Sequence, residues 1–366
     1  MIGGLARAFD NLFGRGEAAV TVPPLDGAMR PNRMLDEAAS RAALDGVDCL
    51  AACGDTLFAS AGADLFELGA DRTWARRKAY GSEVACIAPV GADGLAVALE
   101  SGEVVIEGGP FDGRRYRADA NVTCITAAAV AGSHLYLANG SAANPIGEWQ
   151  RDLLERNASG SIWRIDLDSG AASRIAGDLA WPAGVAVDGE GVVYAEAWKH
   201  RLVRIDPARP GRPQVLHTDL PGYPSRIARA VDGYWLALFA PRSQLVEFVL
   251  REPAYAKRMM AEVPKPFWVA PKLRSGSSFY ESLQGGGVKH LGMLKPWAPT
   301  MSAGLCVKLD AAFQPRSSLQ SRADGRTHGV TSVAEHAGQV FVAARGDGVI
   351  VALPLETHAA DRGGAR

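Results

Sequence analysis

Short apolar segments, separated by turns that contain glycine and aspartate, run through most of the chain. The clearest example lies between residues 179 and 238, where apolar segments at 185–187, 192–195, 201–206 and 214–217 follow one another. The pair Pro221-Gly222 then begins the same pattern again. Short strands at even spacing with such turns are typical of all-β repeat proteins. The pattern therefore predicts β-meanders of four strands that recur along the chain.

The repeat has a period of roughly 40 residues, which is the size of one β-propeller blade. Cys49, Cys86 and Cys124 recur at about this interval, each beside an apolar pair that begins a strand, and Gly184 takes the equivalent place later in the chain. We therefore expect an all-β fold, a six-bladed β-propeller with four-stranded blades. Its innermost strands are expected to begin near Asp48, Ala85, Thr123, Ala183, Arg226 and His328.

Two segments interrupt the period. Residues 148–156 are polar with interspersed Trp and Leu, and they predict a helix or a lid on the third blade. Residues 251–303 predict a lid-like insertion after blade five, with a helix near 251–261 and several aromatic residues, among them Trp297. Long insertions of propellers usually lie on one face and often cover the binding mouth. We expect this insertion to lie over the central channel.

The ends of the chain lie outside the repeats. Apolar residues at helical spacing in 1–13 predict a short amphipathic helix that either packs on the body or contacts a partner or a membrane surface. Residues 34–44 predict a short helix, and 17–22 a strand that closes the ring by pairing with the final strand at 349–355. The expected division is 1–45 for the N-terminal helix and closing-strand region, 46–355 for the propeller and 356–366 for a tail.

Composition excludes several classes of protein. The chain has 366 residues and a formal net charge of -1, without the basic excess of a nucleic-acid-binding protein. No stretch approaches the ~18 uninterrupted apolar residues of a membrane-spanning helix, and residues 1–13 lack the features of a signal peptide. The five cysteines are widely spaced, which argues against a disulfide framework or a CxxC metal site. We expect reduced thiols and a cytoplasmic protein.

Four segments carry a resemblance to a known family. They are GSIWRIDLDSGAASRIAGDLAWPAGVAVD, LPGYPSRIARAVDGYWLAL, GLCVKLDAAFQP and VTSVAEHAGQVFVAARGDGVIVALPL. Their order and spacing resemble the strictosidine synthase-like family of six-bladed propellers, with more distant similarity to paraoxonases and gluconolactonases. The resemblance implies a site for a small-molecule substrate at the mouth of the central channel. Members include a condensing enzyme that uses a channel glutamate, and esterase or lactonase relatives that use a central calcium.

The resemblance assigns residues only where the motifs align. The family's entry Glu of blade one corresponds to Asp48, and the Asn of the blade-three entry corresponds to Asn121. Two motifs differ: the family's Pro-Asn-Gly is Pro182-Ala183-Gly184 here, and its Pro-Asp-Asn is Pro224-Ser225-Arg226. Calcium takes six to eight oxygen ligands, and most of the expected ones are missing, while Arg226 would bring a cation to that position. A central calcium is therefore disfavoured, and no metal ligands are assigned.

The candidate catalytic residues are His328, which falls near the position of the condensing enzyme's Glu, and Asp48. An imidazole titrates near neutral pH and serves as a general acid or base, and Asp48 would orient it or bind an amine. Arg226 is a candidate for binding a substrate carboxylate through its planar fork. The other candidates for substrate binding are Asn121, Ser225, His200 and Trp297. Each has a structural alternative, such as a capping or turn residue.

Three hypotheses of function follow. The first is a metal-independent enzyme with acid–base chemistry, which either hydrolyses an ester or lactone or condenses an amine with a carbonyl compound. Hydrolysis is slightly favoured by analogy with the wider superfamily. The second is a metal-dependent lactonase or arylesterase, and the third is a non-catalytic propeller that binds a small molecule or a protein. Fold alone does not decide among them.

Overall fold

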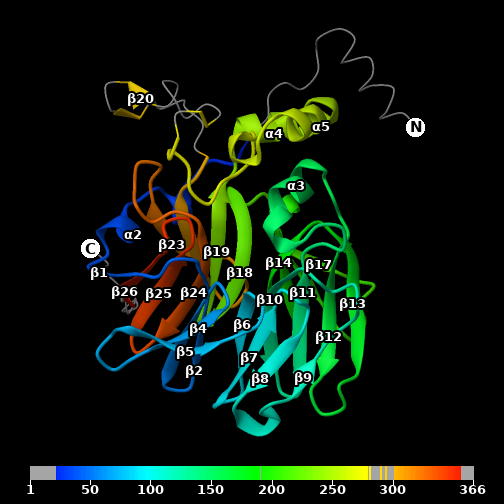
Figure 1. Ribbon diagram of the computed structural model, residues 1–366. Coiled ribbons are helices and arrows are strands. Elements are labelled where there is room, and N and C mark those ends of the chain that lie inside the picture. Colours follow the sequence, from blue (N-terminus) through cyan, green and yellow to red (C-terminus); the bar gives the residue numbers. More distant parts are fainter. Residues whose placement is uncertain are drawn as a thin grey trace, which may run out of the picture.

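Six four-stranded antiparallel sheets are arranged around a central axis (Figure 1). The computed structural model describes residues 22–189, 191–278, 280–281, 289–290, 293–294 and 301–355. The innermost strand of each blade packs against the innermost strands of the two neighbouring blades, and that of blade six packs against that of blade one. The inner strands therefore form a closed ring, which confirms the predicted six-bladed β-propeller.

The strands of each blade follow one another in sequence from the axis outward. The exception is the outermost strand of blade six, which comes from the N-terminal region. The blades consist of β2 (Val47–Cys53), β3 (Thr56–Ala61), β4 (Asp64–Leu68) and β5 (Trp74–Ala79); β6 (Val84–Val90), β7 (Gly94–Leu99), β8 (Val104–Glu107) and β9 (Arg115–Tyr116); β10 (Ile125–Ala131), β11 (His134–Asn139), β12 (Gly160–Asp166) and β13 (Ala172–Leu179); β14 (Pro182–Val187), β15 (Val192–Glu196), β16 (Arg201–Ile205) and β17 (Gln214–His217); β18 (Gly222–Ala230), β19 (Gly233–Pro241), β22 (Gly304–Leu309) and β23 (Pro315–Ser321); and β24 (Val330–His336), β25 (Gln339–Ala344), β26 (Val349–Pro354) and β1 (Ser40–Ala43). Short 3-10 turns occur at Gly27–Met29, Gly109–Phe111, Ile146–Glu148, Ala197–Lys199 and Lys265–Phe267.

Small residues line the inner strands because neighbouring strands approach closely around the axis. Gly184 shows this most clearly: a Cβ added there would lie 2.2 Å from the carbonyl oxygen of Ser225 on the next blade. Cys49 is likewise fully enclosed, with its sulfur 3.5 Å from the carbonyl oxygen of Ile87. The recurrence of small residues in the sequence therefore reflects packing between blades.

The ring is closed by a strand from the N-terminal region. β1 pairs antiparallel with β26, in the register Ser40↔Ala352 to Ala43↔Val349. The strand expected at 17–22 is not the closing strand, because β25 and β1 occupy the two edges of β26; residues 1–21, with the helix expected at 1–13, lie outside the described residues. The helix expected at 34–44 is confined to α2 (Met34–Glu37). The open edge of β26 offers hydrogen-bond partners, which favour a strand over a helix in residues 40–43.

A pair of proline substitutions tests this closure. The amide of Leu44 donates to the carbonyl oxygen of Gly348 at 2.8 Å. Because amides alternate in direction along an antiparallel strand, the amide of Ala42 faces β26 and that of Ala43 faces away. Ala42→Pro removes a bond of the closing ladder and is expected to lower the unfolding free energy by about 1–3 kcal/mol. Ala43→Pro is the matched control, and equal losses of Tm in the two variants would contradict the assigned closure.

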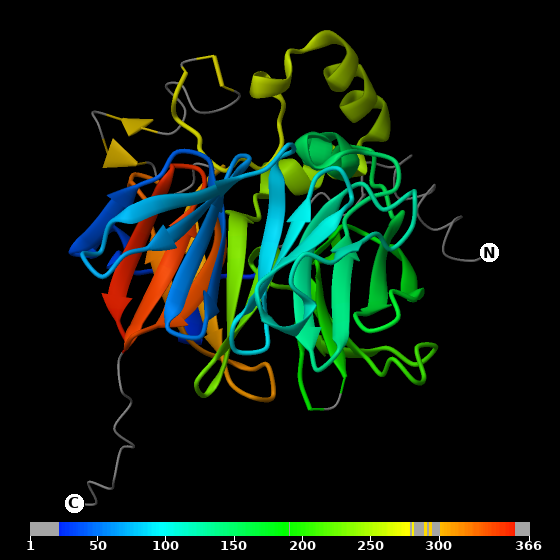
Figure 2. The same cartoon turned by 60° about the horizontal axis from the view of Figure 1, so that its bottom comes forward.

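The insertion lies inside the fifth blade, between its second strand β19 and its third strand β22. It begins with two helices, α4 (Gln244–Arg251) and α5 (Pro253–Glu262), which lie on the same face of the propeller as α3 (Trp149–Leu154) of the third blade (Figures 1 and 2). A two-stranded sheet, β20 (Lys289–His290) and β21 (Met293–Leu294), belongs to the same insertion. None of the helices in the described residues is long and apolar enough to cross a membrane.

α3 and the insertion are joined by a small core and by polar contacts. Lys265 donates to the carbonyl oxygen of Gly147 at 2.5 Å and to Glu148 Oε1 at 2.8 Å. Gln150 Nε2 donates to the carbonyl oxygen of Pro271 at 2.8 Å. The apolar residues that pack between them are Leu154, Val246, Val249, Ala256, Met259, Trp268, Val269, Ala270 and Met301. The two segments that interrupt the repeat therefore form one cap over one end of the channel.

Candidate functional site

The inner strand of every blade carries a β-bulge near the same end. In each strand the pairing with the second strand skips at least one residue. A bulge turns the skipped residue out of the ladder and aims its side chain in a new direction. The skipped residues, in blade order, are Asp48, Ala85, Thr126, Ala183, Ser225 with Arg226, and Thr331. Six bulges around the axis therefore direct backbone and side chains toward one channel mouth.

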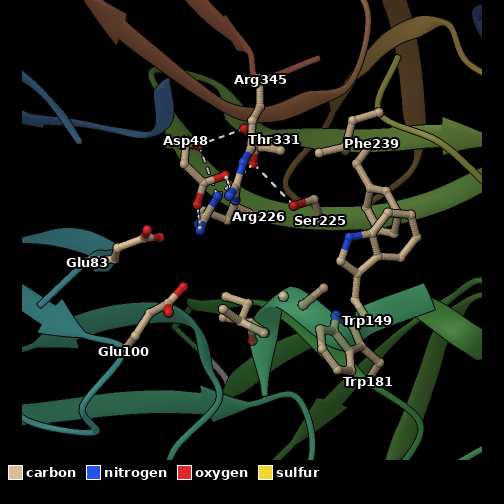
Figure 3. Close-up of a pocket in the computed structure, with 15 residues that line it drawn as sticks. Asp48, Glu83, Glu100, Trp149, Trp181, Ser225, Arg226, Phe239, Thr331 and Arg345 are labelled. Atoms are coloured by element: carbon tan, nitrogen blue, oxygen red, sulfur yellow. Dashed lines mark hydrogen bonds and ion pairs between the residues drawn. The ribbon is translucent and has the colours of Figure 1, made fainter. Parts of the chain in front are cut away.

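A cavity of about 410 Å³ lies at this mouth. Figure 3 shows charged side chains along one wall and aromatic side chains along the other. The lining residues from the bulges are Asp48, Thr126, Ala183, Ser225, Arg226 and Thr331. The others are Glu83, Glu100, Ile146, Gly147, Trp149, Trp181, Phe239, Leu273 and Arg345. Leu273 belongs to the insertion, and Ile146, Gly147 and Trp149 precede or begin α3, so the cap contributes part of the lining.

Asp48 joins two arginines at the base of the charged wall. Arg226 Nη2 lies 2.6 Å from Asp48 Oδ2, and Arg345 Nη1 lies 3.2 Å from Asp48 Oδ1. Burial would raise the pKa of Asp48, but the charges of Arg226 and Arg345 outweigh it and hold that pKa at about 2. Asp48 is therefore ionised at neutral pH. Both of its oxygens are already engaged, which makes it an anchor for the two guanidinium groups.

Arg226 is the more enclosed of the two arginines at the mouth. In addition to Asp48 Oδ2, its guanidinium donates to the carbonyl oxygens of Asp48 at 3.0 Å, Ala85 at 2.8 Å and Thr331 at 3.4 Å. Burial would lower the pKa of Arg226, but the adjacent Asp48 keeps it above its ordinary value. Arg345 differs, because 38% of its side chain remains exposed. Arg345 is therefore the guanidinium available to a ligand in the cavity.

Glu83 and Glu100 face these arginines across the cavity (Figure 3). Glu83 directly precedes β6 and Glu100 directly follows β7, and the amide of Glu100 donates to the carbonyl oxygen of Glu83 at 2.9 Å. Partial burial raises the pKa of Glu100, and the negative charge of Glu83 adds to this. A carboxyl group whose pKa is raised toward neutrality is suited to exchange protons with a substrate.

The aromatic wall is held in place by further aromatic contacts behind it. Trp149 contacts Phe239 edge to face at 5.3 Å between ring centroids, and Trp181 stacks on Trp198 at 5.2 Å. Trp198 Nε1 donates to Asp152 Oδ1 at 2.8 Å, which ties α3 to the fourth blade. This wall can hold the apolar or aromatic part of a small molecule.

Three of the residues singled out from the sequence line the cavity, namely Asp48, Ser225 and Arg226. Ser225 donates its hydroxyl to the carbonyl oxygen of Thr331 at 3.2 Å, which fixes two neighbouring blades. His328, His200 and Asn121 are not among the lining residues. Trp297 lies outside the described residues.

His328 lies behind the mouth and is 0% exposed. Its Nε2 lies 2.8 Å from the carbonyl oxygen of Arg322, so Nε2 carries the proton, and Nδ1 accepts from the hydroxyl of Ser302 at 2.8 Å. Ser302 also contacts the hydroxyl of Ser275, near the middle of the insertion, at 2.6 Å. His328 therefore connects the end of the insertion at Ser302 to the loop that contains Arg322, through contacts that use both ring nitrogens.

His328 predicts an acid-sensitive contribution to stability. Burial lowers the pKa of His328, and the nearby Arg274 adds to this. As the pH falls, this imidazole is therefore protonated near pH 6.5 in the unfolded chain, but only at lower pH in the folded chain. The unfolding free energy is expected to fall as the pH drops below about 6.5. In His328→Gln the fall in Tm between pH 7.5 and pH 5.5 is expected to be smaller by about 2 °C. His217→Gln, at a partly exposed position, is the control; identical pH slopes for wild type and His328→Gln would contradict this role.

The two other predicted residues outside the cavity have local contacts. His200 is buried, with Nδ1 3.1 Å from the carbonyl oxygen of Gly222 and Nε2 3.4 Å from Glu247 Oε1. Asn121 is exposed in a turn, where its amide groups donate to Asp119 Oδ1. Both therefore support connections between strands, at a distance from the cavity lining.

A shift in register explains which residues were missed. The mouth positions of blades three and six are Thr126 and Thr331, each three residues after the strand starts expected at Thr123 and His328. Cys124 is also out of register, because Ala127 is the residue that corresponds to Cys49 and Cys86. Four of the other missed residues share one signal, a charged or aromatic side chain directly before or after a strand: Glu83, Glu100, Trp181 and Arg345. Trp149, which begins α3, and Phe239, within β19, lack this signal.

The residues at the mouth do not fit a central calcium ion. Calcium prefers six to eight oxygen ligands, with carboxylates prominent. Both oxygens of Asp48 are engaged by arginines, and Asn121, the second expected ligand, points into its own turn. Within the described part of the chain, no group of three or more His, Cys, Asp or Glu side chains could hold a metal ion.

No protein-family model matches the sequence, and no curated protein matches it. Among solved structures, the chain is similar to the calcium-binding protein regucalcin of Agrobacterium tumefaciens, with 13% identity and a TM-score of 0.50 over 88% of this chain and 87% of that one. It is also similar to a luciferin-regenerating enzyme, with 13% identity and a TM-score of 0.48 over 87% of this chain and 88% of that one. At this level of identity the likeness to regucalcin supports the propeller fold and nothing finer about the site.

Proposed function

We propose that the chain is a strictosidine synthase-like propeller enzyme that hydrolyses an ester or lactone of a small, partly aromatic molecule, without a metal ion. The observation that carries this proposal is the placement of Glu100, with its raised pKa, in the same cavity as the partly exposed side chain of Arg345. A metal-independent hydrolysis requires a proton acceptor that activates water and a cation that stabilises the oxyanion, and this cavity contains both groups.

The proposed reaction uses the two groups in sequence. Glu100 takes a proton from a water molecule as the water oxygen attacks the carbonyl carbon of the substrate. The carbonyl oxygen becomes an oxyanion, which Arg345 stabilises while Asp48 holds the guanidinium in place. The oxyanion then collapses, the bond between the carbonyl carbon and the leaving oxygen breaks, and Glu100 returns the proton to that oxygen. A lactone yields a hydroxy acid, and an ester yields an acid and an alcohol.

A second reaction class is supported by the pairing of Glu83 with Glu100. Two adjacent carboxylates beside an aromatic wall suit a substrate with an ammonium group and an aromatic ring. An amine–carbonyl condensation would use the same cavity, with Glu100 removing a proton from the amine. This alternative shares the proposed active site and differs in the bond formed.

The proposal is tested by supplying both classes of substrate to the purified protein. One panel contains aryl esters and lactones, and the other contains arylethylamines with aldehydes, each with EDTA and without. Hydrolysis that persists in EDTA and is lost in Glu100→Gln supports the proposed function. Turnover of the amine–aldehyde panel alone favours the condensing alternative. If ligands bind at the mouth but no panel is turned over, the chain is a binding propeller and the proposal fails.

The compartment is also a proposal. All five cysteines are buried and unpaired. Burial raises the pKa of Cys124 to about 12, and it raises that of Cys49 above its ordinary value. Buried thiols of this kind are inert, and their reduced state supports a cytoplasmic location.

A further inference from the structure

The guanidinium of Arg226 lies at the centre of the propeller channel. Arg226 lines the cavity at the mouth and also a second cavity of about 860 Å³ on the other side of it, which is lined largely by Ala and Val residues of the inner strands. Only 11% of the side chain is exposed. Arg226 therefore separates the two halves of the channel.

Four oxygen atoms from three different blades surround this cation. Asp48 of blade one supplies a carboxylate oxygen and its carbonyl oxygen, Ala85 of blade two supplies a carbonyl, and Thr331 of blade six supplies another. Arg226 itself comes from blade five. All four oxygens belong to bulged residues, so the bulges place them at the axis. Contacts from a single side chain thus connect four of the six blades.

Oxygen atoms of this kind form a site for a cation rather than for a neutral group. Three neutral carbonyls and one carboxylate have no hydrogen to donate, and gathering them around one point without a cation would be costly. The planar fork of a guanidinium supplies several donors at fixed angles, which suits contacts to separate blades. The same oxygen types are those that bind hard divalent cations.

We propose that Arg226 is a built-in cation that holds the inner strands together at the channel centre, as a bound divalent ion would. We further propose that its removal converts the channel centre into a calcium site. In Arg226→Ala the four oxygens remain at the axis without the guanidinium. Asp48 Oδ2 and the carbonyl of Ala85 lose this donor, while the carbonyls of Asp48 and Thr331 keep the hydroxyls of Thr331 and Ser225. The volume of the side chain becomes available to a metal ion and its waters. Asp48 keeps its negative charge because Arg345 still contacts it.

The test measures Tm for wild type, Arg226→Ala and Arg226→Ala/Asp48→Asn, in 10 mM CaCl₂ and in sodium chloride of equal ionic strength. Arg226→Ala is expected to lower Tm by about 5 °C or more, because it leaves a buried carboxylate without its main partner. Calcium is expected to restore about 2–4 °C of this in Arg226→Ala, and nothing in the double variant. Calcium titration by calorimetry is expected to show one site per chain.

The controls separate this inference from a general effect of salt. Wild type and Arg226→Lys are expected to show no calcium or EDTA response, because both retain a cation at the channel centre. If Arg226→Ala does not fold, the yield of refolded protein with and without CaCl₂ replaces Tm, and calcium is expected to raise it. A calcium response of wild type that Asp48→Asn abolishes, or no calcium response of Arg226→Ala in either measurement, would overturn the inference.

Discussion

Glu100→Gln is expected to lower kcat by about 10²–10⁴-fold, the usual contribution of a general base or acid. Glutamine keeps the shape of the side chain but accepts no proton at neutral pH. Because the folded state raises the pKa of Glu100, the ionised carboxylate destabilises the fold at neutral pH, and its removal is expected to leave Tm unchanged or slightly higher. A large loss of activity without a loss of stability is thus the expected signature.

The pH profile supplies an independent check on Glu100. The ionised form acts as the base, so kcat/KM is expected to rise with pH through a pKa above the ordinary value of 4.5. Glu83→Gln removes the neighbouring negative charge, lowers the pKa of Glu100 and moves this rise to lower pH while the plateau remains. Glu103→Gln is the control, because its carboxylate contacts Arg115 on the surface. An unchanged rate in Glu100→Gln would remove Glu100 from the mechanism.

Arg345→Ala has the second largest expected effect, a loss of about 10²–10³-fold in kcat with a small change in KM. The reason is that an oxyanion forms only after the attack of water, so the guanidinium contributes more to the transition state than to the bound substrate. Arg345→Lys is expected to recover part of the rate, because the charge returns without the planar fork.

A matched control is available on the same face of the propeller. Arg274 is 36% exposed and contacts Asp347 at 3.2 Å, much as Arg345 contacts Asp48, but it does not line the cavity. Arg274→Ala is expected to leave kcat within about threefold of wild type. Equal losses in Arg274→Ala and Arg345→Ala would attribute the effect to the surface charge of this face and would contradict a role for Arg345 in the reaction.

The fold was predictable because its signal is repeated along the whole chain. Turns and apolar segments recur in every blade, so an error in one blade does not change the period. The closing strand had no such support: residues 34–44 are rich in good helix formers, and only pairing with β26 makes 40–43 a strand. The third and fourth strands of blade five were also difficult to predict, because the insertion separates them from β19 and interrupts the period.

The site was predictable only in blades whose strand starts were located correctly. Asp48, Ser225 and Arg226 were placed at the mouth because motifs fixed their register. His328 and Asn121 do not line the cavity, because a sequence pattern cannot locate a bulge or a longer connecting loop. The bulged residues are Thr331, three positions after His328, and Thr126, five positions after Asn121. Glu100 required knowledge of where the second strand ends, which depends on pairing with residues of the same blade.

The pairing of β1 with β26 has a consequence for synthesis of the protein. β1 is synthesised before blade one and β26 after blade five, so residues 40–43 stay unpaired until residues 349–352 have been made. Contacts so distant in sequence form slowly, and an unpaired strand edge invites pairing with other chains during that time. The nascent chain is therefore most exposed to misassembly just before β26 emerges from the ribosome.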